Sequence, residues 1–117
     1  MIHDNVMIGD FMLGNNSQST RIAIRGIGPS LTNYGLSNVL ADPTLALHDG
    51  NGTLLVSNDN WQDDPVSAAQ LTANGLAPQN TLESGIFTTL PPGSFTAILA
   101  GNAPSTGIGL VEIYNLK

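Results

Sequence analysis

The sequence predicts an all-β protein, an antiparallel two-sheet sandwich with a jelly-roll-like arrangement, about seven strands and one short helix. Short runs that alternate apolar and polar residues recur along the chain, and they are separated by Gly, Pro and Asn, which favour turns. Helical periodicity is scarce, and the chain is poor in Lys and Glu. At 117 residues, the chain suits a single module, residues 1–117, built around one core.

Seven segments have the composition of strands. The second is the clearest, because Arg21 and Arg25 alternate with Ile22 and Ile24, so that both arginines should share one face. In the first segment, Gly9-Asp10 predicts a bulge. The predicted strands are Asn5–Leu13, Thr20–Ile27, Leu45–Leu47, Leu54–Val56, Gly85–Leu90, Ser94–Ala100 and Gly107–Tyr114.

The segments between the strands contain turn and helix signals. Asp49-Gly50-Asn51-Gly52 tolerates positive φ and predicts a β-hairpin between the third and fourth strands. Residues 65–74 carry the helix signals, since Asp63 or Asp64 can cap the first turn, Pro65 suits its first position and Gly75 ends it. A single helical turn is also expected over residues 30–34.

Composition limits the partners that the chain can bind. Nine acidic and three basic residues give a net charge of −6, and nucleic-acid binding depends on Lys and Arg that neutralise phosphates. No apolar stretch reaches the ~20 residues of a membrane helix. We therefore expect no nucleic-acid partner and no membrane insertion. The absence of Cys excludes disulfides, zinc–thiolate sites and thiol nucleophiles.

No catalytic motif is found, and we expect a protein that is not an enzyme. Ser30 lies in Gly-Pro-Ser-Leu-Thr and not in the Gly-x-Ser-x-Gly turn of hydrolases. His48 directly precedes Asp49, which indicates a local hydrogen bond instead of metal binding or acid–base catalysis.

A cluster of amides and carboxylates follows the hairpin and is a candidate calcium site. Calcium takes six to eight oxygen ligands from such groups, although the spacing differs from that of an EF-hand loop. The alternative is that these short side chains cap turns and start the helix at Pro65. The candidate ligands are Asp49, Asn58, Asp59, Asn60, Asp63 and Asp64.

Three further side chains each allow two interpretations. Arg21 and Arg25 could hold an anionic ligand, or they could pair with acidic residues on a neighbouring strand. The second interpretation is favoured in so acidic a chain. Trp61 could stack on a carbohydrate, or it could plug one end of the sandwich. A sugar platform normally needs more than one aromatic ring, which favours the plug.

Several motifs together resemble a module repeated in very large surface and secreted proteins of environmental bacteria. The Arg-Gly-x-Gly-Pro-Ser-Leu run at residues 25–31 is the most specific of them. The middle of the chain also resembles the pre-peptidase C-terminal type of β-sandwich, a non-catalytic accessory domain. The matching segments are residues 21–31, 40–45, 58–61, 76–78, 83–84, 90–93, 95–96 and 107–114.

The resemblance implies an extracellular or cell-surface location and an architectural, adhesive or accessory role. It also implies a further strand before the segment that begins at Asp4, where this sequence has only Met1–His3, so we expect an unfilled sheet position. An open edge between apolar strands invites another chain to add a strand. The expected function is that of a structural subunit, joined to other copies by strand exchange into a fibre. The alternative is a calcium- or carbohydrate-binding accessory domain of a secreted protein.

Overall fold

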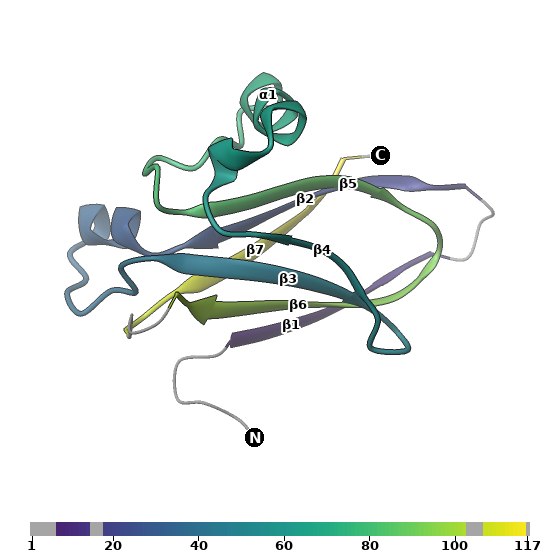
Figure 1. Cartoon of the computed structure of the whole chain (residues 1–117), viewed down its shortest axis with the longest axis horizontal. Coiled ribbons are helices and arrows are strands. Elements are labelled where there is room, and N and C mark those ends of the chain that lie inside the picture. Colours follow the sequence, from purple (N-terminus) through teal and green to yellow (C-terminus); the bar gives the residue numbers. More distant parts are fainter. Residues whose placement is uncertain (1–6, 15–17, 103–106, 117) are drawn as a thin grey trace.

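The computed structural model describes residues 7–14, 18–102 and 107–116, and there it confirms the all-β sandwich. Two antiparallel sheets pack face to face (Figure 1). The first sheet has the strand order β1–β6–β3–β4, and the second has the order β5–β2–β7. The strands are β1 (Met7–Leu13), β2 (Thr20–Ile27), β3 (Pro43–Asp49), β4 (Leu54–Asn58), β5 (Ser84–Leu90), β6 (Gly93–Gly101) and β7 (Leu110–Asn115).

Three helical segments connect the strands. The 3₁₀ helix η1 (Pro29–Tyr34) follows β2, and η2 (Trp61–Asp63) leads into α1 (Pro65–Ala73). The side chain of Asp64 caps α1 by accepting hydrogen bonds from the backbone of Val66 at 3.1 Å and Ser67 at 3.4 Å. Of the two caps that the sequence allows, Asp64 is therefore the one used. The helix ends one residue before the predicted Asn74, which is its C-cap.

The core lies between the sheets and contains the inward-facing side chains of both. Alternation along β3 buries Leu45 and Leu47, and β6 buries Ala97 and Leu99 in the same way. Each fully buried Leu or Ile stabilises the fold by roughly 1.5–3 kcal/mol relative to exposure. The buried cluster is Leu13, Ile22, Ile24, Leu40, Leu45, Leu47, Ile86, Leu90, Phe95, Ala97 and Leu99.

The irregular points of the strands differ from the prediction. The expected bulge at Gly9-Asp10 is wrong, because both residues pair regularly with β6. Gly9 instead packs closely against β7. A Cβ on Gly9 would lie 3.5 Å from Ile113 Cδ1 and 3.6 Å from Val111 Cγ1. The register shift occurs between Leu47 and His48, in the β3–β4 hairpin.

A buried carboxylate anchors the segment between β2 and η1. Glu83 is fully buried, and its Oε2 accepts hydrogen bonds from the backbone of Gly28 at 2.9 Å, from the backbone of Ser30 at 2.8 Å and from the Ser30 hydroxyl. Its Oε1 accepts from the backbone of Asn80 at 3.2 Å. A Cβ at Gly28 would overlap the carbonyl of Leu40. This close packing explains the glycine in the Gly-Pro-Ser-Leu run.

Candidate functional site

The two lateral sides of the sandwich end in different ways. On the side of β4 and β5, which we call the capped side, side chains satisfy the outer backbone of β5. The Asn58 side chain accepts a hydrogen bond from the Gly85 amide at 2.9 Å, and the Ser67 hydroxyl accepts one from the Phe87 amide at 2.9 Å. Both η2 and α1 pack against β5. Strand β4 is only five residues long, and short edge strands offer little surface for pairing.

The other side, formed by β1 and β7, is here called the open side, and it lies opposite α1 in Figure 1. Each of these strands has a sheet partner on one side only among the described residues. Large apolar side chains of β1 are exposed, with Met7 at 42%, Ile8 at 54% and Met12 at 79%. On β1, and on β7 between Leu110 and Tyr114, no side-chain hydrogen bond like those on β5 is present.

An ion pair neutralises the one carboxylate on β7. Arg25 of β2 donates from Nε to Glu112 Oε1 at 2.8 Å and from Nη2 to the same oxygen at 2.5 Å. Burial lowers the pKa of Arg25, whereas the hydrogen bond and the charge of Glu112 raise it, and the net shift is upward. The guanidinium also lies 5.6 Å from the centre of the Tyr114 ring. Strand β7 therefore presents no uncompensated charge.

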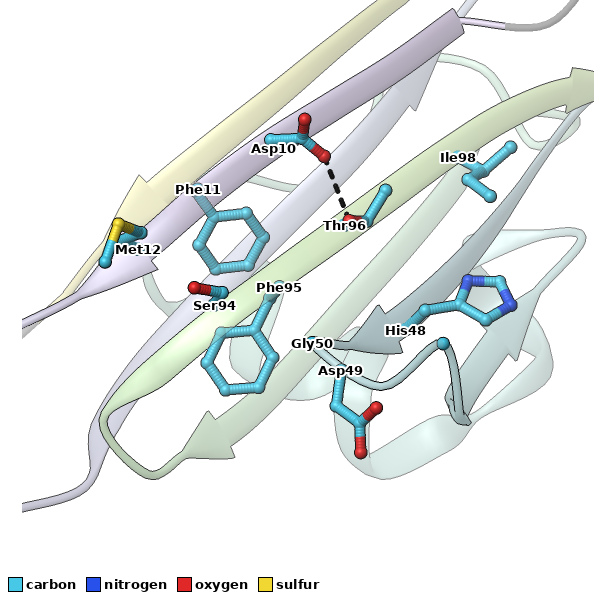
Figure 2. Close-up of a pocket in the computed structure, with 11 residues that line it drawn as sticks. Asp10, Phe11, Met12, His48, Asp49, Gly50, Ser94, Phe95, Thr96 and Ile98 are labelled. Atoms are coloured by element: carbon cyan, nitrogen blue, oxygen red, sulfur yellow. Dashed lines mark hydrogen bonds between the residues drawn. The ribbon is translucent and has the colours of Figure 1, made fainter.

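A groove of about 690 Å³ lies beside β1, β6 and the turn of the β3–β4 hairpin (Figure 2). On β1 and β6, the Thr96 hydroxyl donates to Asp10 Oδ1 at 2.9 Å, and the Phe11 and Phe95 rings stack with centres 5.5 Å apart. His48 also lines the groove, and its Nδ1 is buried without a hydrogen-bond partner.

Three of the six predicted calcium ligands accept turn and cap hydrogen bonds from nearby backbone amides. Asp49 Oδ1 accepts from the backbone of residues 51 and 53 in the hairpin turn. Asp63 Oδ2 accepts from the backbone of Asn60 at 3.3 Å around η2, and Asp64 caps α1. Asn58 pairs with Leu45, at the opposite end of the hairpin from Asp49. The structure thus does not bring the six residues together.

Asp59 joins two residues that the sequence did not suggest as ligands. The side-chain amide of Asn102 donates to Asp42 Oδ2 at 3.2 Å and to Asp59 Oδ2 at 3.3 Å. Burial raises the pKa of Asp59, and the nearby charges of Asp42 and Asp63 raise it further. Asp42 and Asn102 come from distant parts of the chain, so spacing could not reveal them. Within the described residues, no three acidic or histidine side chains are placed to hold one metal ion.

The remaining candidates have structural contacts. The predicted pairing of arginine with a neighbouring strand is confirmed for Arg25, whereas Arg21 donates to the carbonyl of Leu116 at 3.3 Å. The expected bond between His48 and Asp49 is absent, because the Asp49 carboxylate accepts from backbone amides. Trp61 is half-buried, and its Cβ lies 3.1 Å from the Cβ position of Gly85 on β5. The Trp61 backbone also donates to the carbonyl of Glu83 at 2.9 Å.

Comparison with known proteins found no matching family model, no similar curated protein and no similar solved structure. The resemblance to the bacterial surface modules and to the pre-peptidase domains therefore stays a prediction. None of the helices in the described ranges is long and apolar enough to cross a membrane.

Proposed function

We propose that this chain is a non-catalytic structural subunit of an extracellular bacterial assembly, joined to other copies by strand exchange on its open side. The contrast between the two lateral sides carries the proposal. Side chains and a helix protect β5, whereas no such cover lies on β1 and β7 within the part of the chain that the structure describes. Edges of this kind favour pairing with another chain. The extracellular location rests on the resemblance to surface and secreted modules.

Exposed apolar surface on β1 favours association between copies of the chain. Met7 lies on the inward face of β1, opposite Leu99 of β6, and is 42% exposed, so a partner strand that covered it would remove apolar surface from water at roughly 25 cal/mol per Å². The segment that one copy lends and the open side that receives it on the next copy are different surfaces, so the contact is head to tail. Repetition of that contact in one direction gives a fibre.

Sedimentation at increasing concentration, followed by negative-stain electron microscopy, tests the proposal. We expect concentration-dependent assembly and filaments. A stable monomer at all concentrations, with no filaments, would contradict the proposal. In the variant Met7→Lys, a charge on the inward face of β1 should weaken assembly. Val66→Lys is the control, since Val66 is 74% exposed on α1 of the capped side, and it should leave assembly unchanged.

A calcium-binding accessory domain is the second candidate, favoured by the carboxylates of Asp42 and Asp59. Burial raises the pKa of Asp59, the charge of Asp42 raises it further, and a divalent cation would relieve the repulsion between the two carboxylates. Calorimetric titration with calcium should then show binding that Asp59→Asn removes and Asp49→Asn preserves. A glycan screen with a Trp61→Ala control tests the carbohydrate alternative.

A further inference from the structure

The strand order leaves the two sheets unequal on the open side. Counted from the capped side, the first sheet runs β4, β3, β6, β1, and the second runs β5, β2, β7. Strand β4 faces β5 across the core, and both β6 and β1 face β7. We infer that the strand lent by a second copy of this chain takes the fourth place of the second sheet, beside β7 and beneath β1. This inference rests on the proposed function.

The place beside β7 offers two surfaces to an incoming strand. One is the outer backbone of β7, and the other is the inward face of β1, which extends over β7 at Gly9. The core side chains nearest this place, Phe11, Val111 and Ile113, pack against the buried cluster and are only partly buried. An incoming strand with apolar residues at every second position would cover them.

The place beside β1 offers an incoming strand less surface to pack against. A strand added there would extend the four-stranded sheet further beyond β7, and no strand of the second sheet among the described residues lies beneath that position. Its inward side chains would remain exposed to water. Strand β1 also carries the charge of Asp10, whose carboxylate has a hydroxyl partner, Thr96, but no cation within 4 Å among the described residues. Charged side chains on an edge strand oppose pairing.

The charge distribution favours a second copy as the source of the strand. Asp10, Arg21, Arg25 and Glu112 are the described charged residues of β1, β2 and β7, and their formal charges sum to zero. The other six described carboxylates lie outside these strands. A second copy, with a net charge of −6, therefore meets the least repulsion when its strand approaches through the open side.

Residue-resolved amide hydrogen exchange on the intact chain, dilute and assembled, tests the inference. Assembly should slow exchange at the outward-facing amides of β7 between Leu110 and Tyr114 and leave the outer amides of β1 unchanged. Slowed exchange on β1 alone would overturn the placement while preserving the proposed function. A chain that does not assemble at all would overturn the proposed function itself.

A pair of charge variants provides a second test. Arg25→Gln leaves Glu112 without its cation beside the proposed strand, and we expect self-association to weaken by up to about fivefold, as for an unfavourable charge on a strand pair. Arg21→Gln removes the same charge from the same strand without touching Glu112, and it should have a smaller effect. Equal effects of the two variants would contradict a strand seated beside β7. The exchange rates of core amides in each variant show whether it is folded.

Discussion

The capped and open sides of this sandwich are built from the same kind of strand but are finished differently. On the capped side, Asn58 and Ser67 provide oxygens for amides that β5 would otherwise offer to another chain. On the open side, the same row of backbone groups has no such partners on β1 or on β7 between Leu110 and Tyr114. Protection of an edge therefore depends on a few polar side chains delivered by neighbouring loops and helices, and not on the composition of the strand alone.

The largest difference is expected between removing the buried carboxylate of Glu83, which precedes β5, and removing the carboxylate of Glu112 on the open side. Glu83→Ala leaves the buried amides of Gly28 and Ser30 without their acceptor, and we expect the free energy of unfolding to fall by roughly 3 kcal/mol or more. Glu112→Ala breaks a partly exposed ion pair and should cost only about 1 kcal/mol. Urea unfolding of both variants measures the difference. Equal losses would mean that Glu83 does not anchor its segment.

A smaller effect is expected where the cap of β5 is removed. Ser67→Ala deletes the acceptor of the Phe87 amide, which should lower the free energy of unfolding by about 1–2 kcal/mol and add association through β5. Thr96→Ala is the matched change on the open side. Its hydroxyl bonds an exposed carboxylate, so stability should change by less than about 0.5 kcal/mol. If sedimentation shows no additional self-association of the Ser67→Ala variant, α1 alone shields β5.

The smallest expected effect is a gain in stability from Asp59→Asn. Burial and the neighbouring charges of Asp42 and Asp63 raise the pKa of Asp59 in the folded state, so the folded protein binds a proton more readily than the unfolded chain does. The stability of the original protein therefore falls as the pH rises from the ordinary value of 3.8 through the raised folded pKa. The variant should lack this fall.

Thermal unfolding at a series of pH values measures that effect. Because solvent screens part of the repulsion, the gain at neutral pH should stay below about 1 kcal/mol. Asp10→Asn, on β1, is the control and should not reproduce the gain. A loss of stability in Asp59→Asn would show that the bond from Asn102 matters more than the repulsion.

Local patterns were sufficient to predict the fold class, because strand alternation and turn chemistry act over a few residues. The hairpin, the helix at Pro65 and the ionic role of Arg25 all follow from such patterns. The bulge prediction failed because a glycine in a strand has more than one cause, and the approach of β7 to Gly9 is set by residues about a hundred positions away.

The site was harder to predict for the same reason. The amide-rich loop after the hairpin was read as a set of ligands, yet two of its carboxylates cap local backbone. The pairs that matter most, Glu83 with Gly28 and Asp42 with Asp59, join segments that sequence spacing does not relate. Which strands end the sheets depends on strand order, and that order is fixed by long-range packing that periodicity does not encode.

The position of β2 at the centre of its sheet has a consequence for synthesis. Its partners β5 and β7 begin 57 and 83 residues after β2 ends. During synthesis on the ribosome, β2 therefore stays unpaired on the order of seconds before either strand exists. An apolar strand of high β-propensity left unpaired for that time invites aggregation, and interspersed charges act against it. Arg21 and Arg25 supply those charges. Arg25, which binds Glu112 in the folded protein, thus also acts before folding, when its charge keeps the unpaired nascent strand from aggregating with other strands.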